Sequence, residues 1–143
     1  MICTFFGHRD TPDSVKKSLK EAILNLSNTQ GVKTFCVGNN GKFDYMVQSV
    51  LKEISNNDTS INYLIVLSSL CEKVNCNQIG NTIFPEELDD VPPQFAISKR
   101  NEWLIKNSDF TIVYLRNTVT NTYKWVEKSK RKGLKVINLF KQE

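Results

Sequence analysis

Residues that could bind a ligand or take part in a reaction follow directly after an apolar stretch near the start of the chain. The segment CTFFGHRD, residues 3–10, leads through Gly7 into His8 and Arg9, and His8 is the single histidine of the sequence. Glycine lets a backbone approach a ligand closely, and arginine can hold a phosphate or carboxylate through paired hydrogen bonds. A lone histidine is more often structural than catalytic. Beside an arginine at a strand end, however, we interpret His8 as a ligand contact, which in any reaction would serve as a general acid or base.

Three other segments contain residues suited to an anionic ligand. Each follows an apolar stretch, and together they supply glycine, amide and hydroxyl groups. For any one segment, the alternative is that these are simply good turn residues. Four such segments at one edge of a sheet favour a binding site for a phosphate-bearing ligand. The candidate ligand-binding residues of the three segments are Gly38, Asn39, Asn40, Gly41, Phe43, Asp44, Ser68, Asn117, Thr118, Thr120, Asn121 and Thr122.

A cation lies on an otherwise apolar helix face later in the chain. The segment QFAISKRNEWLIKNSD, residues 94–109, places Arg100 and Asn101 between apolar positions that share that face. A buried arginine is costly unless it is paired. One interpretation is a structural ion pair with Asp44 or Asp109. The other is a guanidinium that holds a phosphate or carboxylate of the ligand.

Five apolar strands alternating with four helices would position these residues. This pattern predicts a three-layer Rossmann-like (flavodoxin-like) α/β sandwich, with a mainly parallel five-stranded sheet in the order 3-2-1-4-5 and one domain over residues 1–143. Ligands of such sheets bind beyond the carboxyl ends of the strands. Thr11 and Pro12 predict the start of the first helix, and residues 68–93 predict a long irregular loop. The predicted strands are residues 2–6, 33–37, 61–67, 110–115 and 136–139.

Composition narrows the classes of function. The chain has 143 residues, a net charge of +4 and four cysteines. No apolar run is long enough to cross a bilayer and no secretory signal is present, so we expect a cytoplasmic protein with no membrane partner. The mild positive charge fits a small anionic ligand better than nucleic acid. The cysteine spacing and the single histidine predict no metal site. Both standard phosphate-binding glycine motifs are missing, which argues against a dinucleotide dehydrogenase or a P-loop NTPase. No cofactor is expected.

The ordered set of segments resembles the SLOG superfamily, which groups the DprA and LOG proteins, and is most similar to its YpsA-like branch. The resemblance rests on CTFFGHRD, FCVGNNGKFD, RNEWLIKNSDFTIVYL and RKGLKVINLF, and covers nearly the whole chain. It implies a bacterial or phage domain that binds a nucleotide or nucleotide-derived ligand, with cyclic signalling molecules of bacterial defence as one class. Related domains often form dimers, so a homodimer is an open alternative.

Two other functions remain as alternatives. The first is a LOG-like nucleotide N-glycosidase (phosphoribohydrolase), with Arg100, His8 and Asp44 as candidate catalytic residues. Arg100 matches the arginine of that family, but the segment RNTVTNTYKWVEK lacks the family's glycine-rich turn, and Glu127 comes about one helical turn too late. This departure favours a binding module over an enzyme. The second alternative is DprA-like binding of single-stranded nucleic acid through the lysines of residues 124–135 and Trp125.

Overall fold

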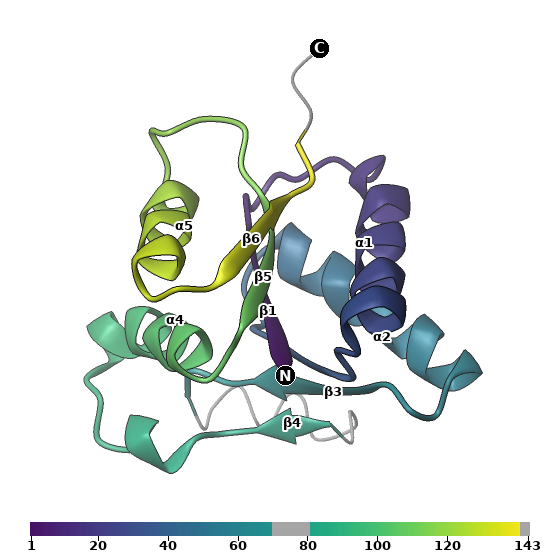
Figure 1. Ribbon diagram of the computed structural model, residues 1–143. Coiled ribbons are helices and arrows are strands. Elements are labelled where there is room, and N and C mark those ends of the chain that lie inside the picture. Colours follow the sequence, from purple (N-terminus) through teal and green to yellow (C-terminus); the bar gives the residue numbers. More distant parts are fainter. Residues whose placement is uncertain (70–80, 141–143) are drawn as a thin grey trace.

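The computed structural model describes residues 1–69 and 81–140 of the chain. Strands and helices alternate along the sequence and form one sheet with helices on both faces (Figure 1). The elements are β1 (Ile2–Gly7), α1 (Val15–Gln30), β2 (Thr34–Val37), α2 (Lys42–Asn57), β3 (Asn62–Val66), β4 (Thr82–Ile83), η1 (Glu86–Leu88), η2 (Pro93–Phe95), α4 (Ala96–Lys106), β5 (Phe110–Tyr114), α5 (Asn121–Arg131) and β6 (Lys135–Asn138).

Within the described residues, the sheet has six strands in the order β4-β3-β2-β1-β5-β6, and all neighbouring strands are parallel. The prediction of five strands in the order 3-2-1-4-5 is therefore wrong in strand number and full order. The added strand, β4, pairs with β3 through Ile65 and Thr82 and extends the sheet at that edge. It has two residues inside the segment that was expected to be irregular. A pair of residues is too short to show any hydrophobic period.

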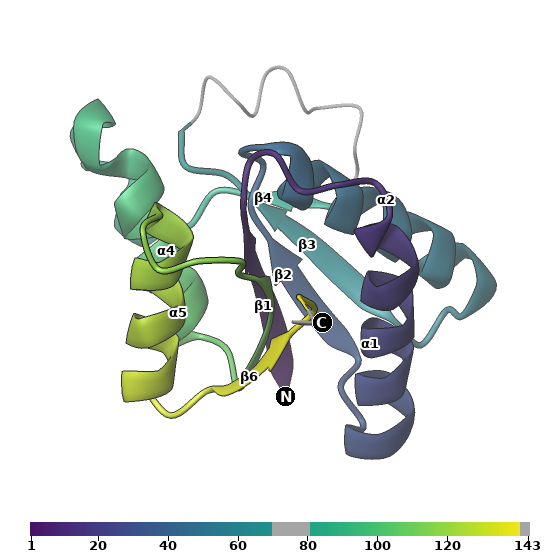
Figure 2. The ribbon, with the colours of Figure 1, turned by 90° about the horizontal axis from the view of Figure 1, so that it is seen from above.

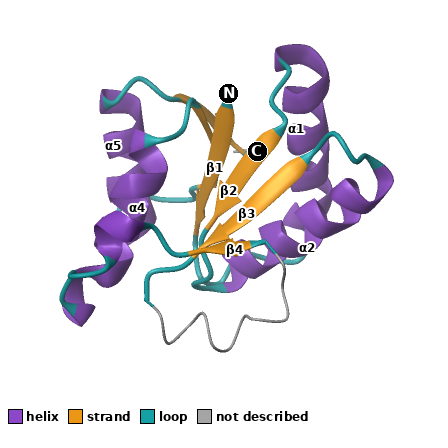
Figure 3. Ribbon diagram, turned by 90° about the horizontal axis from the view of Figure 1, so that it is seen from below, coloured by secondary structure: helices purple, strands orange, loops and turns teal. Residues whose placement is uncertain are grey.

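Helices cover the two faces of the sheet in pairs. Helices α1 and α2 lie on one face, and α4 and α5 lie on the other (Figures 1 and 2). The view from below shows the parallel strands between the two helix pairs (Figure 3). This three-layer arrangement with a parallel sheet is a Rossmann-like α/β fold.

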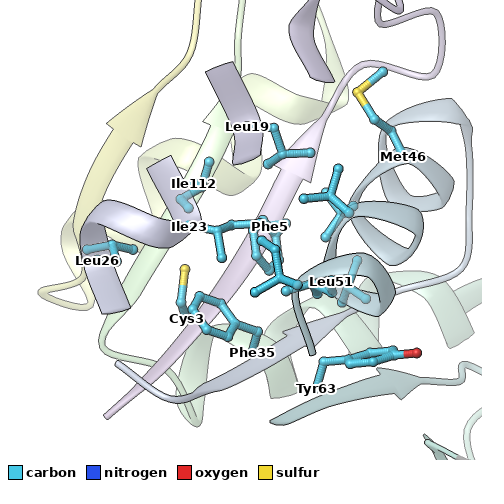
Figure 4. Close-up of a cluster of buried hydrophobic side chains, with 14 of the residues drawn as sticks. Cys3, Phe5, Leu19, Ile23, Leu26, Phe35, Met46, Leu51, Tyr63 and Ile112 are labelled. Carbon is cyan, nitrogen blue, oxygen red and sulfur yellow. The ribbon is translucent and has the colours of Figure 1, made fainter. Parts of the chain in front are cut away.

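Side chains of successive strand residues pack into two separate hydrophobic cores, one on each face of the sheet. Cys3 and Phe5 pack under α1 and α2, whereas Phe6 packs toward α4 and α5. This alternation follows from the two-residue period of a strand and explains why the central strands read as continuous apolar runs. Figure 4 shows the larger core, in which Leu19 and Ile23 of α1 pack near Phe5.

The first helix begins later than predicted. It starts at Val15, and the hydroxyl of Thr11 donates a hydrogen bond to the carbonyl oxygen of His8 at 2.6 Å instead of capping a helix. A threonine hydroxyl can satisfy nearby backbone in a turn as well as at a helix start. The helix ends at Gly31, which has a φ of 71°. None of the helices within residues 1–69 and 81–140 is both long and apolar enough to span a bilayer.

Candidate functional site

A cavity of about 550 Å³ lies at the ends of β1 and β2. Its walls come from four parts of the chain: the loop after β1, the loop after β2, one face of α4, and the loop after β5 with the first turn of α5. Parallel strands end at the same edge of a sheet, so these distant segments meet there. The sequence-predicted residues that line the cavity are Gly7, His8, Arg9, Gly38, Asn40, Asp44, Arg100, Asn101, Thr120, Asn121 and Thr122.

The other predicted residues lie beside the cavity or support its walls. Asn39 is buried behind Arg100, and Gly41 adopts a φ of 92° at the start of α2. Phe43 is buried against Gly7, where any side chain would overlap its ring. Outside the lining, Ser68 is buried after β3, whereas Asn117 and Thr118 are exposed after β5. Asn117 accepts a hydrogen bond from the backbone N–H of Val119, which is the turn role considered for such residues.

Three asparagine side chains orient the guanidinium of Arg100. Its Nη1 donates to Oδ1 of Asn39 at 3.1 Å and to Oδ1 of Asn40 at 2.8 Å. Its Nε and Nη2 donate to Oδ1 of Asn101 at 3.4 and 3.3 Å. Arg100 is only 2% exposed, and a Cβ at Gly38 would lie 2.7 Å from its Cζ. Glycine at position 38 is thus required for the guanidinium to lie against the β2–α2 turn.

Amide oxygens are neutral acceptors, and these bonds fix the orientation of the guanidinium. The nearby carboxyl group is that of Asp44, which is buried in the first turn of α2 and accepts a hydrogen bond from the backbone N–H of Asn40 at 3.0 Å. Burial raises the pKa of Asp44 to about 6, although the charge of Arg100 and the hydrogen bond from Asn40 both oppose this. Asp44 therefore changes its protonation state close to neutral pH.

His8 links the ends of two neighbouring strands. Its Nε2 accepts a hydrogen bond from the backbone N–H of Arg116 at 3.0 Å, and its ring lies edge-on to Tyr114. An accepting Nε2 must be unprotonated, and burial, followed by the charge of Arg116, lowers the pKa of His8. The side chain also lines the cavity. In this arrangement His8 fixes the loop after β5 to the loop after β1, and Nε2 is already engaged.

The N-terminus of α5 lies at the cavity, and its first backbone N–H groups are hydrogen-bond donors. Thr120 precedes the helix, and none of the first-turn N–H groups of α5 receives a side-chain cap from it. Its Oγ1 is buried and has no hydrogen-bond partner among the residues that the structure describes. The N-terminus of a helix carries a partial positive charge and points N–H groups outward. This wall of the cavity suits an anion.

Sequence reasoning missed several lining residues. Asp10 lies at the rim, where it forms an ion pair with Arg116 at 2.7 Å. The others are Phe5 and Phe6 of β1, Ile97, Ser98 and Leu104 of α4, and Val119 of the loop before α5. Lys124 and Trp125 of α5 also line the cavity, whereas the sequence suggested them only for nucleic-acid binding. Apolar positions of α4 share the helix face of Arg100. That shared face was the signal that could have placed Ile97 and Leu104 in the site.

Metal ligation has no support in the part of the chain that is described. Cys3 and Cys36 are free and buried, and no group of three or more histidine, cysteine, aspartate or glutamate side chains gathers among residues 1–69 and 81–140. Cys71 and Cys76 lie outside the described residues.

Comparison with solved structures identifies a protein of similar fold. No family model and no curated protein matches the sequence. Among solved structures, that of DNA processing protein A (DprA) from Streptococcus pneumoniae matches 95% of this chain with a TM-score of 0.70 and 16% sequence identity. The chain spans about half the length of that protein, 49% of which is covered. At this identity the likeness establishes a shared Rossmann-like α/β fold with DprA.

Proposed function

We propose that the chain binds a small nucleotide-like anion in the cavity at the ends of β1 and β2. The observation that carries this proposal is the convergence of the buried Arg100 guanidinium and the N-terminus of α5 on one cavity. A guanidinium and a helix N-terminus are both suited to phosphate. A volume of about 550 Å³ falls in the range of small-molecule sites.

The charges around the cavity support the same ligand class. Arg9 and Lys124 add two cations to the lining. Of the two acidic lining residues, Asp10 is paired with Arg116, and the raised pKa of Asp44 reduces its negative charge near pH 6. An anionic ligand would therefore meet more positive than negative charge.

The family assignment is part of this proposal. The shared fold with DprA and the matching segments support membership of the SLOG superfamily, and we assign the chain to its YpsA-like branch. Sensing of a nucleotide signal in bacterial or phage defence is the biological role that this assignment implies.

Calorimetric titration with the four common nucleoside 5′-monophosphates tests the proposal. We expect at least one to bind, with Kd below about 1 mM. Arg9→Gln and Lys124→Gln should each weaken binding, because each removes one lining charge, whereas Lys52→Gln should not, because Lys52 is exposed on α2 and outside the lining. If none of the four nucleotides binds, the proposal is refuted.

Nucleic acid is the competing ligand, and the same titration separates it. Trp125 is buried, and the amines of Lys124 and Lys128 lie 5.0 and 5.8 Å from its ring centroid. This ring is therefore poorly placed to stack an incoming base. Affinity for oligonucleotides that rises with length and falls steeply with salt would favour the DprA-like alternative over a small-ligand site.

Cleavage of the ligand is the second candidate function. Asp44 favours it, because a cavity-lining carboxyl group with a pKa of about 6 can take and return a proton at neutral pH. Incubation of the bound nucleotide with the protein, followed by chromatography for free base, tests this function. Product release that Asp44→Asn abolishes while binding persists would establish an enzyme, and binding without product would leave a binding module.

A further inference from the structure

The lining of the cavity includes buried polar residues and exposed aliphatic ones. Arg100 and Asn101 are buried, as are Gly38 and Asp44, and all four border the cavity. Ile97 and Val119 also border it, but they are 39% and 90% exposed. Burial therefore places these polar groups deep in the cavity, beside the buried apolar Phe5, Phe6 and Leu104. It places the two aliphatic side chains near the mouth, where Arg9 and Lys124 are also exposed.

The two aliphatic side chains come from different elements. Ile97 lies in the first turn of α4, three positions before Arg100, and Val119 lies in the loop that enters α5. These helices lie side by side on one face of the sheet (Figures 1 and 2). Residues 116–122, RNTVTNT, are polar or charged apart from Val119. Among the described residues, Val119 is almost fully exposed, so its side chain can pack against a ligand at the mouth of the cavity.

We infer that the ligand enters with its anionic group first, and that Ile97 and Val119 hold its unsaturated ring at the mouth of the cavity. The inference rests on the proposed function and specifies its ligand: a nucleotide with a terminal phosphate monoester at the floor and its base facing outward. The phosphate would lie near the guanidinium of Arg100, which packs against Gly38. Aliphatic side chains pack on the faces of a planar ring and remove apolar surface from water.

Matched variants at the mouth test the inference. Val119→Ser and Ile97→Ser should each weaken binding of the tightest-binding nucleoside monophosphate by about 5- to 10-fold, the scale expected for losing contact with one or two buried methyl groups. Binding of ribose 5-phosphate, which has the anion without the ring, should stay unchanged. Phe95→Ser is the control, because Phe95 is 52% exposed near Ile97 but does not line the cavity. Circular dichroism checks that each variant is folded.

Chemically modified ligands test the orientation independently. A nucleoside monophosphate with a bulky group on the exocyclic amine of its base should bind as tightly as the parent compound, whereas the methyl ester of its phosphate should bind at least about 10-fold more weakly. The reverse order of affinities would overturn the inference, as would an equal loss of nucleotide and ribose 5-phosphate binding in the two mouth variants. Either result leaves the proposed function standing. Failure of all nucleotides and of ribose 5-phosphate to bind would overturn both.

Discussion

Asp44 should make the folded protein less stable as the pH rises through about 6. Its carboxyl group is buried, and its pKa is raised from the ordinary value of 3.8 to about 6. The folded chain therefore holds a proton that the unfolded chain has already lost over this interval. Stability from this group is fully present below pH 3.8 and is lost as the pH rises toward and past the folded pKa.

The size of the effect follows from the two pKa values. A rise from 3.8 to about 6 corresponds to about 3 kcal/mol of unfolding free energy. Asparagine at position 44 would keep an oxygen to accept the hydrogen bond from Asn40 and would remove the ionisation. We therefore expect the unfolding free energy of Asp44→Asn, relative to that of the wild type, to rise by up to about 3 kcal/mol as the pH rises from about 4 to about 7.5.

Urea unfolding followed by tryptophan fluorescence measures this difference at a series of pH values. Comparing the variant with the wild type cancels the titration of the remaining groups. Asp58→Asn is a control whose pH dependence of stability should have the opposite sign. Hydrogen bonds from Ser60 lower the pKa of the exposed carboxyl group of Asp58. Asp58 therefore stabilises the fold above pH 3.8, and that contribution is lost on acidification. The reasoning would be refuted if the difference in unfolding free energy between Asp44→Asn and the wild type were the same at about pH 4 as at about pH 7.5.

Three further substitutions test the geometry of the site. Gly38→Ala places a Cβ 2.7 Å from the guanidinium at the cavity floor, so titration should show about a 10-fold weaker nucleotide affinity. Gly7→Ala forces a methyl group onto the buried ring of Phe43, and urea unfolding should show a loss of about 1–3 kcal/mol. His8→Phe leaves the backbone N–H of Arg116 without its acceptor, at a cost of about 1–3 kcal/mol. Because the pKa of His8 is lowered, its contribution is present above pH 6.5 and is lost as the pH falls.

Much of the fold could be predicted because its signals are local. The continuous apolar runs at residues 2–6 and 110–115 predict buried parallel strands, and the apolar spacing within residues 43–54 predicts a helix. Glycine at position 31 ends a helix in the left-handed conformation that other residues avoid. The two-residue strand β4 and the late start of α1 were missed, because neither a pair of residues nor one threonine specifies a unique local structure.

Part of the candidate site was also predictable. Residues that directly follow β1 and β2 had to lie at one edge of a parallel sheet, and Gly7, His8, Gly38 and Asn40 do line one cavity. The partners of Arg100 were not predictable. The sequence offered Asp44 or Asp109 as its partner, whereas three asparagine side chains orient it and Asp44 acts on it through charge.

The sequence by itself determined which segments become strands, helices and turns, since periodicity and turn chemistry act between near neighbours. Only the tertiary structure decided which side chains share the cavity. Arg100 contacts Asn39 across 61 positions, and Arg116 contacts His8 across 108. Such contacts depend on the pairing of β1 with β5 and on the packing of α4 and α5 against the sheet. They also decide which apolar residues, such as Ile97, line the cavity instead of packing in the core.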